Sequence, residues 1–296
     1  MTELTDQQRA IDAGPHPVLV VAGPGAGKTR TLVGRATRLL TASDPLHRVA
    51  AEQILAVTFT RRAAGELRER LAQNLTQKLA PKLARTPGDS PLVDIPRADT
   101  LHAIALSQWT SAEPEAAKPE MEPETQPGLT SGADAGTDGT NSENMRQPGN
   151  ASLPAVLSEE AARAVFAKAN PDRPAAELRA AWNRLSLARE RLEDLHAVPE
   201  FPDLPDMAAR YAACKKAAHL ADYTDLLEHW LKALTATRAP SPWTEILVDE
   251  IQDLSPLQVA VIRALLPPSG RGFFGIGDPD QAVYGFRGAH PDVRAA

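Results

Sequence analysis

The stretch "VLVVAGPGAGKTRTLVGRATRLL", residues 18–40, decides the fold of this chain. A run of aliphatic residues breaks into a glycine-rich turn, and apolar residues then return at helical spacing. A strand, a glycine-rich turn and a helix in this order are typical of a phosphate-binding loop, in which backbone amides and the helix N-terminus face the phosphates. The stretch therefore predicts an α/β domain that binds a nucleotide.

The residues of this loop have separate expected roles. Lys28 is expected to reach the β and γ phosphates, and the hydroxyl of Thr29 is expected to ligate Mg²⁺. The loop begins at Ala22, where a glycine is usual. The other residues expected to hold the phosphates are Gly23, Gly25, Ala26 and Gly27. A glycine-rich turn without a ligand is the alternative interpretation.

Composition indicates a globular chain of one large domain or two smaller ones. The chain has 296 residues, of which 43% are hydrophobic and only one is cysteine, so an internal disulfide is excluded. The N-terminal residues "MTELTDQQRAIDAG" lack the basic and apolar regions of a secretory signal. No apolar run approaches the ~18 residues that a transmembrane helix needs. We expect a cytoplasmic protein without a membrane partner.

The negative charge of the chain is concentrated in residues 110–150. This segment carries eight acidic and two basic residues, which accounts for the whole net charge of −6. Because the remainder is formally neutral, the net charge does not exclude a nucleic-acid partner. The segment is also rich in Pro, Gly, Ser and Thr and poor in aliphatic residues, which predicts a disordered acidic linker.

The rest of the chain predicts one parallel sheet interrupted by helices. Apolar runs at 17–22, 53–59, 244–250 and 272–278 are typical of buried strands. Residues 152–237 contain stretches of helix formers and no convincing strand. We therefore expect a discontinuous nucleotide-binding domain, a helical insertion and a linker, which cover residues 1–109 with 222–296, 151–221 and 110–150.

A second candidate element is "ILVDEIQD", in which a strand delivers Asp249 and Glu250 at its carboxyl end. Ligands of open α/β sheets bind at this edge. Asp249 is expected to ligate Mg²⁺, and Glu250 is expected to orient and deprotonate the water that attacks the γ-phosphate. Taken alone, an acidic pair after a strand is often only a solvated strand end.

Seven segments now carry a resemblance to a known family. They are, in order, "LTDQQRAI", "AGPGAGKTRTL", "ILAVTFTRRAAGELRERL", "DTLHAIAL", "DYTDLL", "ILVDEIQDLSPLQ" and "GIGDPDQAVYGFRGA". They resemble the Q motif and motifs I, Ia, Ib, Ic, II and III of UvrD/Rep-type superfamily 1 DNA helicases. The resemblance implies a RecA-like P-loop NTPase domain, called 1A, with an inserted helical subdomain, called 1B. It also implies an ATP-dependent translocase and helicase on single-stranded DNA and ss/ds DNA junctions, with 3′-to-5′ direction, in DNA repair or replication restart.

The resemblance assigns further nucleotide contacts. It implies that Gln8 reads the adenine edge and that Arg30 lies by the base or ribose. It implies that Gln281 senses the γ-phosphate and couples it to DNA, and that Arg287 contacts the γ-phosphate.

The DNA side follows from the same resemblance. Phe59, Tyr284 and Phe286 are candidates for stacking on unpaired bases, which requires only an aromatic face. Phosphate or sugar contacts are expected from Thr58, Thr60, Arg61, Thr100 and His102. Arg61 stands where the family usually has an amide, and Phe286 stands where it usually has tryptophan, so we expect stronger phosphate attraction at the first position and weaker stacking at the second.

The sequence ends at Ala296, shortly after motif III. The resemblance implies a second motor domain with motifs IV to VI, which has no counterpart here, so a C-terminal motor domain of the same polypeptide is an expected partner. The isolated chain is expected to bind ATP and hydrolyse it poorly. A naturally shortened, nucleotide-gated DNA-binding module without motor activity is the alternative. An unrelated P-loop kinase would explain the first motif only.

Overall fold

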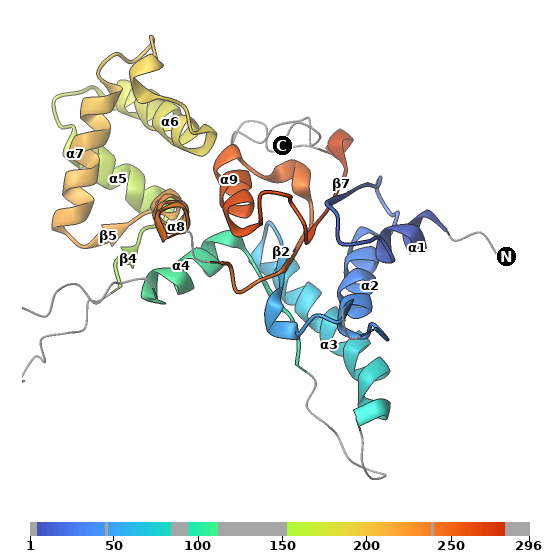
Figure 1. Ribbon diagram of the computed structural model, residues 1–296. Coiled ribbons are helices and arrows are strands. Elements are labelled where there is room, and N and C mark those ends of the chain that lie inside the picture. Colours follow the sequence, from blue (N-terminus) through green and yellow to red (C-terminus); the bar gives the residue numbers. More distant parts are fainter. Residues whose placement is uncertain (1–4, 45–46, 84–93, 112–152, 238–239, 282–296) are drawn as a thin grey trace, which may run out of the picture.

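The computed structural model describes residues 5–44, 47–83, 94–111, 153–237 and 240–281 (Figure 1). The predicted site residues Tyr284, Phe286 and Arg287 lie outside these ranges, as does most of the expected linker. The first two residues of that expected linker end helix α4 (Leu101–Ser111). Among the described residues, no helix combines the length and apolarity that crossing a membrane requires.

The centre of the molecule is a parallel sheet of five strands in the order β1-β7-β6-β2-β3. Its strands are β1 (Val18–Val21), β2 (Ile54–Val57), β3 (Arg97–Asp99), β6 (Glu245–Val248) and β7 (Phe273–Gly277). The register pairs Val20 with Ile276 and Ala56 with Leu247. The four apolar runs are confirmed as strands, and so is the predicted α/β class. The strand β3 was not predicted.

Helices cover both faces of the sheet. Helices α2 (Lys28–Leu40) and α3 (Arg61–Leu83) lie on one face, and α4, α8 (Tyr223–Thr237) and α9 (Pro256–Leu265) lie on the other (Figure 1). Alternate residues of β2 serve the two cores, with Ile54 facing α2 and Leu55 facing α4. Burial on both faces explains why β2 and β6 are continuous apolar runs, whereas Leu19 and Val21 of the edge strand β1 are exposed. The short helix α1 (Asp6–Ile11) packs on α2.

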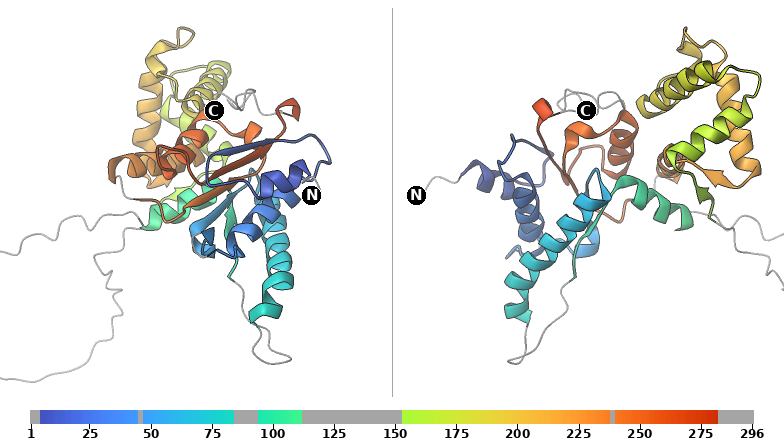
Figure 2. Two further views of the ribbon diagram at one scale, coloured as in Figure 1. Left: turned by 45° about the vertical axis from the view of Figure 1, so that its right-hand side comes forward. Right: turned by 180° about the vertical axis from the view of Figure 1, so that it is seen from behind.

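A helical block stands beside the sheet (Figure 2). It contains α5 (Glu159–Ala169), α6 (Ala175–Arg191) and α7 (Leu204–Ala217) and has its own core, centred on Phe166, Trp182 and Tyr211. The hydroxyl of Ser158 accepts the Ala161 N–H at 3.2 Å and so caps the start of α5. The described residues also contain the 3₁₀ turns Ala51–Gln53, Leu195–Ala197, Ile251–Asp253 and Pro279–Gln281.

The expectation that residues 152–237 contain no strand is wrong. Two short parallel strands, β4 (Ala155–Val156) and β5 (Leu220–Ala221), flank the helical block and bring its two ends together. The Leu157 N–H donates to the Ala221 carbonyl at 2.8 Å. Strands of two residues have no periodicity to read, because tertiary pairing alone creates them.

A buried ionic cluster joins the helical block to the start of α8. Arg189 of α6 donates to Asp222, Asp225 and Glu228 at 2.7–2.9 Å. Lys215 of α7 pairs with Asp222 at 2.6 Å and also with Asp225. Burial alone would raise the pKa of Asp222, but the two cations outweigh it and hold this pKa below its usual value. The cluster therefore fixes the N-terminus of α8 to two helices of the block.

Candidate nucleotide and DNA site

Parallel strands bring the predicted motifs to one edge of the sheet. The glycine-rich loop follows β1, the pair Asp249–Glu250 follows β6, and Asp278 follows β7. The segments that begin at Thr58 and Thr100 follow β2 and β3. The strand order places the phosphate-binding elements on one half of this edge and the predicted DNA contacts on the other.

The loop after β1 has the backbone of a phosphate site. Gly25 and Gly27 have φ angles of +73° and +82°, in the left-handed region that favours glycine. Gly27 is also the residue that caps α2, so the loop leads directly into the helix N-terminus. The Ala22 N–H donates to the Gly277 carbonyl at 2.9 Å, which fixes the start of the loop to β7. Backbone amides in such a turn, with the positive end of the helix dipole, favour an anion.

Lys28 joins this loop to the acidic pair. Its ammonium lies 2.9 Å from a carboxylate oxygen of Glu250, and the lysine side chain is only 11% exposed. More than two hundred residues separate the two in sequence, and the fold brings them into direct contact. The P-loop lysine and the predicted catalytic carboxylate therefore belong to one site.

Glu250 has an unusual backbone conformation. Its φ and ψ of 50° and 51° are left-handed, which is rare for a residue with a side chain. Its carboxylate also accepts the Nε2–H of Gln252 at 2.9 Å. Strained backbone of this kind gathers at functional sites, where the surrounding structure holds it.

Asp249 is a buried carboxylate that forms no ion pair within the part of the chain that the structure describes. It is 8% exposed and accepts the Glu250 N–H at 3.1 Å. Burial, and after it the neighbouring charge of Glu250, raises the pKa of Asp249 to about 6, against the smaller opposing effects of its hydrogen bond from Glu250 and of the charges of Lys28 and Arg70. A divalent cation fits such an oxygen ligand. The described residues contain no group of three or more His, Cys, Asp or Glu that would hold a metal alone. The site therefore suits a cation that takes most of its ligands from phosphate and water. Its predicted protein ligands are Asp249 and the half-buried Thr29.

Replacing Asp249 with asparagine is expected to stabilise the nucleotide-free chain. A carboxyl group whose pKa is raised on folding costs stability once it is ionised, so the native carboxylate destabilises the fold as pH rises from about 4 through about 6. At pH 7.5, Asp249→Asn should raise the free energy of unfolding by about 1–3 kcal/mol. Urea denaturation at pH 7.5 and pH 4 measures this, and the gain should vanish at pH 4. A loss of stability at pH 7.5 would contradict the assignment.

Gln252 is a site residue that the sequence analysis missed. It is 2% exposed, and besides its bond to Glu250 it accepts the Asp278 N–H at 2.9 Å. Gly277 makes this approach feasible, because a Cβ there would lie 2.3 Å from the Gln252 Oε1. Gln281 in turn donates to the Asp278 carboxylate. A chain of hydrogen bonds therefore runs from Glu250 to the predicted γ-phosphate sensor.

The Q motif contacts the first turn of α2 through Gln7. Gln7 donates to the Thr31 hydroxyl at 3.0 Å, beside the N-terminus of α2. Gln8 donates instead to Asp12 at 2.7 Å on the exposed side of α1. The adenine contact of Gln8 stays a prediction, as does the base or ribose contact of Arg30, which is exposed on the first turn of α2.

The threonines predicted to contact DNA have structural partners. Thr60 accepts the Ala63 N–H at 3.1 Å, and Thr100 accepts the Ala103 N–H at 3.3 Å, so both hydroxyls cap helix starts. Thr58 is buried and donates to the Thr60 carbonyl at 3.1 Å. The threonines therefore shape the turns after β2 and β3, and DNA contacts by their hydroxyls remain predicted.

Aromatic and basic side chains surround these turns. His102 contacts Tyr223 edge to face, with ring centroids 5.6 Å apart, and Tyr223 is 41% exposed. Arg61 is exposed at the first turn of α3, next to the half-buried Phe59. Tyr223 was not predicted as a site residue, although it lies in the "DYTDLL" segment. An aromatic residue inside a motif segment is the sequence signal that could have found it, because bases stack on aromatic rings.

Comparison with known proteins places the chain in a family. The family model described as UvrD/REP helicase N-terminal domain matches residues 4–294. DNA helicase IV of Escherichia coli is 27% identical over 98% of this chain and 42% of its own length. ATP-dependent DNA helicase UvrD2 of Mycobacterium tuberculosis H37Rv is 31% identical over 97% of this chain and 38% of its own length. DNA helicase II of Salmonella typhimurium is 29% identical over 98% of this chain and 35% of its own length. This chain therefore spans less than half the length of these relatives. The chain belongs to the UvrD/Rep helicase family and contains that family's N-terminal domain.

Proposed function

We propose that this chain is the ATP- and DNA-binding N-terminal part of an ATP-dependent single-stranded DNA translocase and helicase. The supporting observation is the ion pair between Lys28 and Glu250, which joins the phosphate-binding loop to the acidic turn at one sheet edge. The relatives that bear helicase names support the same conclusion. A cytoplasmic location, a 3′-to-5′ direction, a role in repair or replication restart, action at ss/ds junctions and a C-terminal motor domain rest on the sequence analysis alone.

ATP binding would replace the ion pair between Lys28 and Glu250 with contacts between Lys28 and the phosphates. In the nucleotide-free chain Glu250 neutralises Lys28, and incoming phosphates would compete for the same ammonium. Release of Glu250 would free its carboxylate to orient and deprotonate a water. Mg²⁺, held by Thr29, Asp249 and the phosphates, would supply charge neutralisation at the transferring phosphoryl group.

The sheet offers a short path from nucleotide to DNA. The Asp249 N–H donates to the Val57 carbonyl at 2.9 Å, immediately before Thr58. A shift of the turn after β6 would therefore move the turn after β2 directly. This contact makes β6 and β2 the proposed link between ATP hydrolysis and the grip on a single strand.

The test of nucleotide binding is Lys28→Ala. Loss of the ammonium removes the principal cation of the loop, so we expect the affinity for Mg·ATP to fall by about 100-fold or more. Isothermal titration calorimetry on this chain measures it. Lys216→Ala, which removes an exposed lysine of α7, is the matched control and should bind as the wild type does. Equal affinity of Lys28→Ala and wild type would reject the proposed function.

A further inference from the structure

Glu190, near the end of α6, lies where the helical block meets the sheet domain. Helix α6 packs on both α8 and α9 (Figure 1). The Glu190 carboxylate accepts the Thr224 hydroxyl at 3.4 Å and also forms a hydrogen bond with the Ser255 hydroxyl. Thr224 lies in the first turn of α8, and Ser255 is the residue that caps α9. One side chain of the helical block therefore contacts the starts of two helices of the sheet domain.

Ser255 is closely connected to the acidic turn of the nucleotide site. The 3₁₀ turn Ile251–Asp253 lies between the two, and its last N–H donates to the Glu250 carbonyl at 3.0 Å. Ser255 is 4% exposed, and its hydroxyl oxygen accepts the Gln258 N–H at 3.3 Å. The hydroxyl proton therefore remains available for Glu190. A displacement of Glu250 would reach Glu190 through this compact segment.

Thr224 is connected to the predicted DNA side in a similar way. It directly follows Tyr223, which is 41% exposed and contacts His102 edge to face. On its other side, Asp222 accepts a hydrogen bond from Arg189 of α6 at 2.9 Å. The start of α8 is thus held to α6 at neighbouring positions. A small movement of α6 would therefore move the exposed ring of Tyr223.

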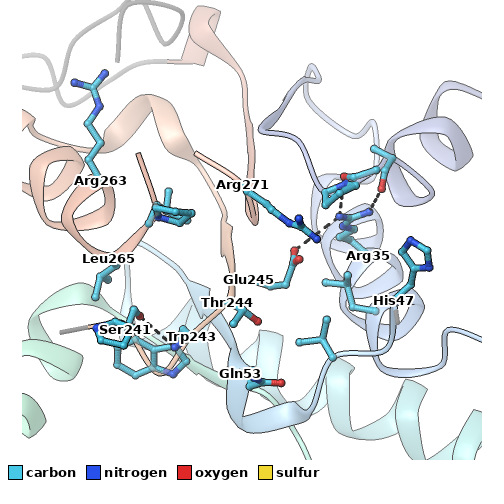
Figure 3. A pocket seen from close by; sticks show the side chains of 18 of the residues that line it. Arg35, His47, Gln53, Ser241, Trp243, Thr244, Glu245, Arg263, Leu265 and Arg271 are labelled. Carbon is cyan, nitrogen blue, oxygen red and sulfur yellow. Dashed lines mark hydrogen bonds and ion pairs between the residues drawn. The ribbon is translucent and has the colours of Figure 1, made fainter. Parts of the chain in front are cut away.

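The opposite end of β6 is held in place by charge. Its first residue, Glu245, lies 3.8 Å from Arg35 of α2, and Figure 3 shows Arg35 and Arg271 beside the Glu245 carboxylate. Arg35 is 4% exposed and also donates to the Gly14 carbonyl at 3.3 Å. Because this end of the strand is fixed to α2, we expect a displacement at Glu250 to pass forward into α9 rather than back along β6.

Glu190 is an unusual residue for a contact between helices. It forms no ion pair within the part of the chain that the structure describes, because the adjacent Arg189 is engaged by three carboxylates of the α8 region. Burial raises the pKa of Glu190, and the hydrogen bonds from Ser255 and Thr224 and the charge of Arg189 only partly offset this. An ionised carboxylate with a raised pKa lowers stability, which favours a functional role over a packing role.

We infer that Glu190 is a positioning residue, which couples nucleotide binding at the acidic turn to the grip of Tyr223 on single-stranded DNA. The hydroxyls of Ser255 and Thr224 are the two contacts that transmit this coupling. When phosphates displace Glu250 from the lysine of the loop, the start of α9 shifts, and α6 carries the start of α8 with it. This inference rests on the proposed function, since it requires both ligands. It adds to the contact between β6 and β2 a second route, which passes through the helical block.

The test measures the linkage between the two ligands. The affinity of this chain for fluorescein-labelled oligo-dT is determined by fluorescence anisotropy, with and without Mg²⁺ and a non-hydrolysable ATP analogue. We expect the nucleotide to change the DNA affinity of the wild type by about fivefold or more, the usual range for coupled sites, and that of Glu190→Ala hardly at all. The affinity of Glu190→Ala for either ligand alone should stay within about twofold of the wild type, because Glu190 touches neither ligand.

Further variants separate coupling from folding. Glu190→Gln keeps an oxygen that accepts a hydroxyl, so it should restore most of the nucleotide effect. Thr224→Val removes only the hydroxyl on the DNA side. It should reduce the effect as Glu190→Ala does, and the two changes together should reduce it no further, because both break the same contact. Glu160→Ala, which removes an exposed carboxylate of α5, is the matched control. Circular dichroism checks folding, and Thr224→Val decides alone if Glu190→Ala is unfolded.

The outcomes distinguish this inference from the proposed function. A wild-type chain that binds both ligands without coupling them would overturn the role of Glu190, and so would an unchanged nucleotide effect in folded Glu190→Ala. In both cases the proposed function stands. A wild-type chain that binds neither the ATP analogue nor DNA would reject the proposed function, and this inference with it.

Discussion

The substitution Glu250→Gln is expected to lower ATP hydrolysis by the full-length polypeptide by about 10²–10⁴-fold, the usual contribution of a general base. In the nucleotide-free chain the Glu250 carboxylate lies 2.9 Å from the lysine that would hold the γ-phosphate, so it occupies the region where an attacking water must be deprotonated. Glutamine keeps the shape and can still accept from Gln252, but it cannot take the proton. Steady-state hydrolysis with saturating single-stranded DNA measures the loss.

The same substitution, Glu250→Gln, should not weaken ATP binding. Glutamine no longer neutralises Lys28, so phosphates face less competition, and we expect affinity for Mg·ATP to be equal to that of the wild type or higher. Glu159→Gln removes an exposed carboxylate of α5 and should leave both hydrolysis and binding unchanged. A normal turnover rate in Glu250→Gln would end the assignment of the base. A wild-type polypeptide that binds ATP but never hydrolyses it would favour the shortened, nucleotide-gated module.

The parts of the fold that sequence predicts are those with continuous local signals. The stretch before Asp249 is apolar because both faces of the sheet are covered there, and the stretch before Ala22 is an apolar run at the sheet edge; each ends in a recognisable turn. Strand β3 escapes prediction because it has only three residues, Arg97–Asp99, two of them charged. Its strand conformation comes from pairing with β2 rather than from its own composition.

The candidate site also has parts that the sequence predicts and parts that only the folded structure reveals. Residue types predict the loop and the acidic pair, but they do not predict that Lys28 and Glu250 already neutralise one another. Nor do they distinguish Gln7 from Gln8, since consecutive positions on a helix differ by about 100° in direction and only packing decides which one faces the loop.

Arg189→Ala is expected to destabilise the chain by about 3–5 kcal/mol, the usual cost of removing one partner from a buried ion pair. The Arg189 side chain is 15% exposed. Its loss leaves Asp222 and Asp225 with Lys215 as the one remaining cation among the described residues. Arg163→Ala is the matched control, because its pair with Glu159 is 3.5 Å long and half exposed, and such pairs contribute about 0–1 kcal/mol. Urea denaturation of the two variants measures the difference.

The pH dependence shows whether charge is the cause. Because the cations hold the pKa of Asp222 below its usual value, the stability that they supply is complete above about pH 4 and is lost as pH falls through the lowered pKa. The deficit of Arg189→Ala should therefore shrink under acid conditions, where its stranded carboxylates can be protonated. A deficit that stays constant down to pH 3 would assign the effect to lost packing instead. Since Tyr223 directly follows Asp222 and contacts His102, the same variant in the full-length polypeptide should also weaken single-stranded DNA binding at temperatures where it remains folded.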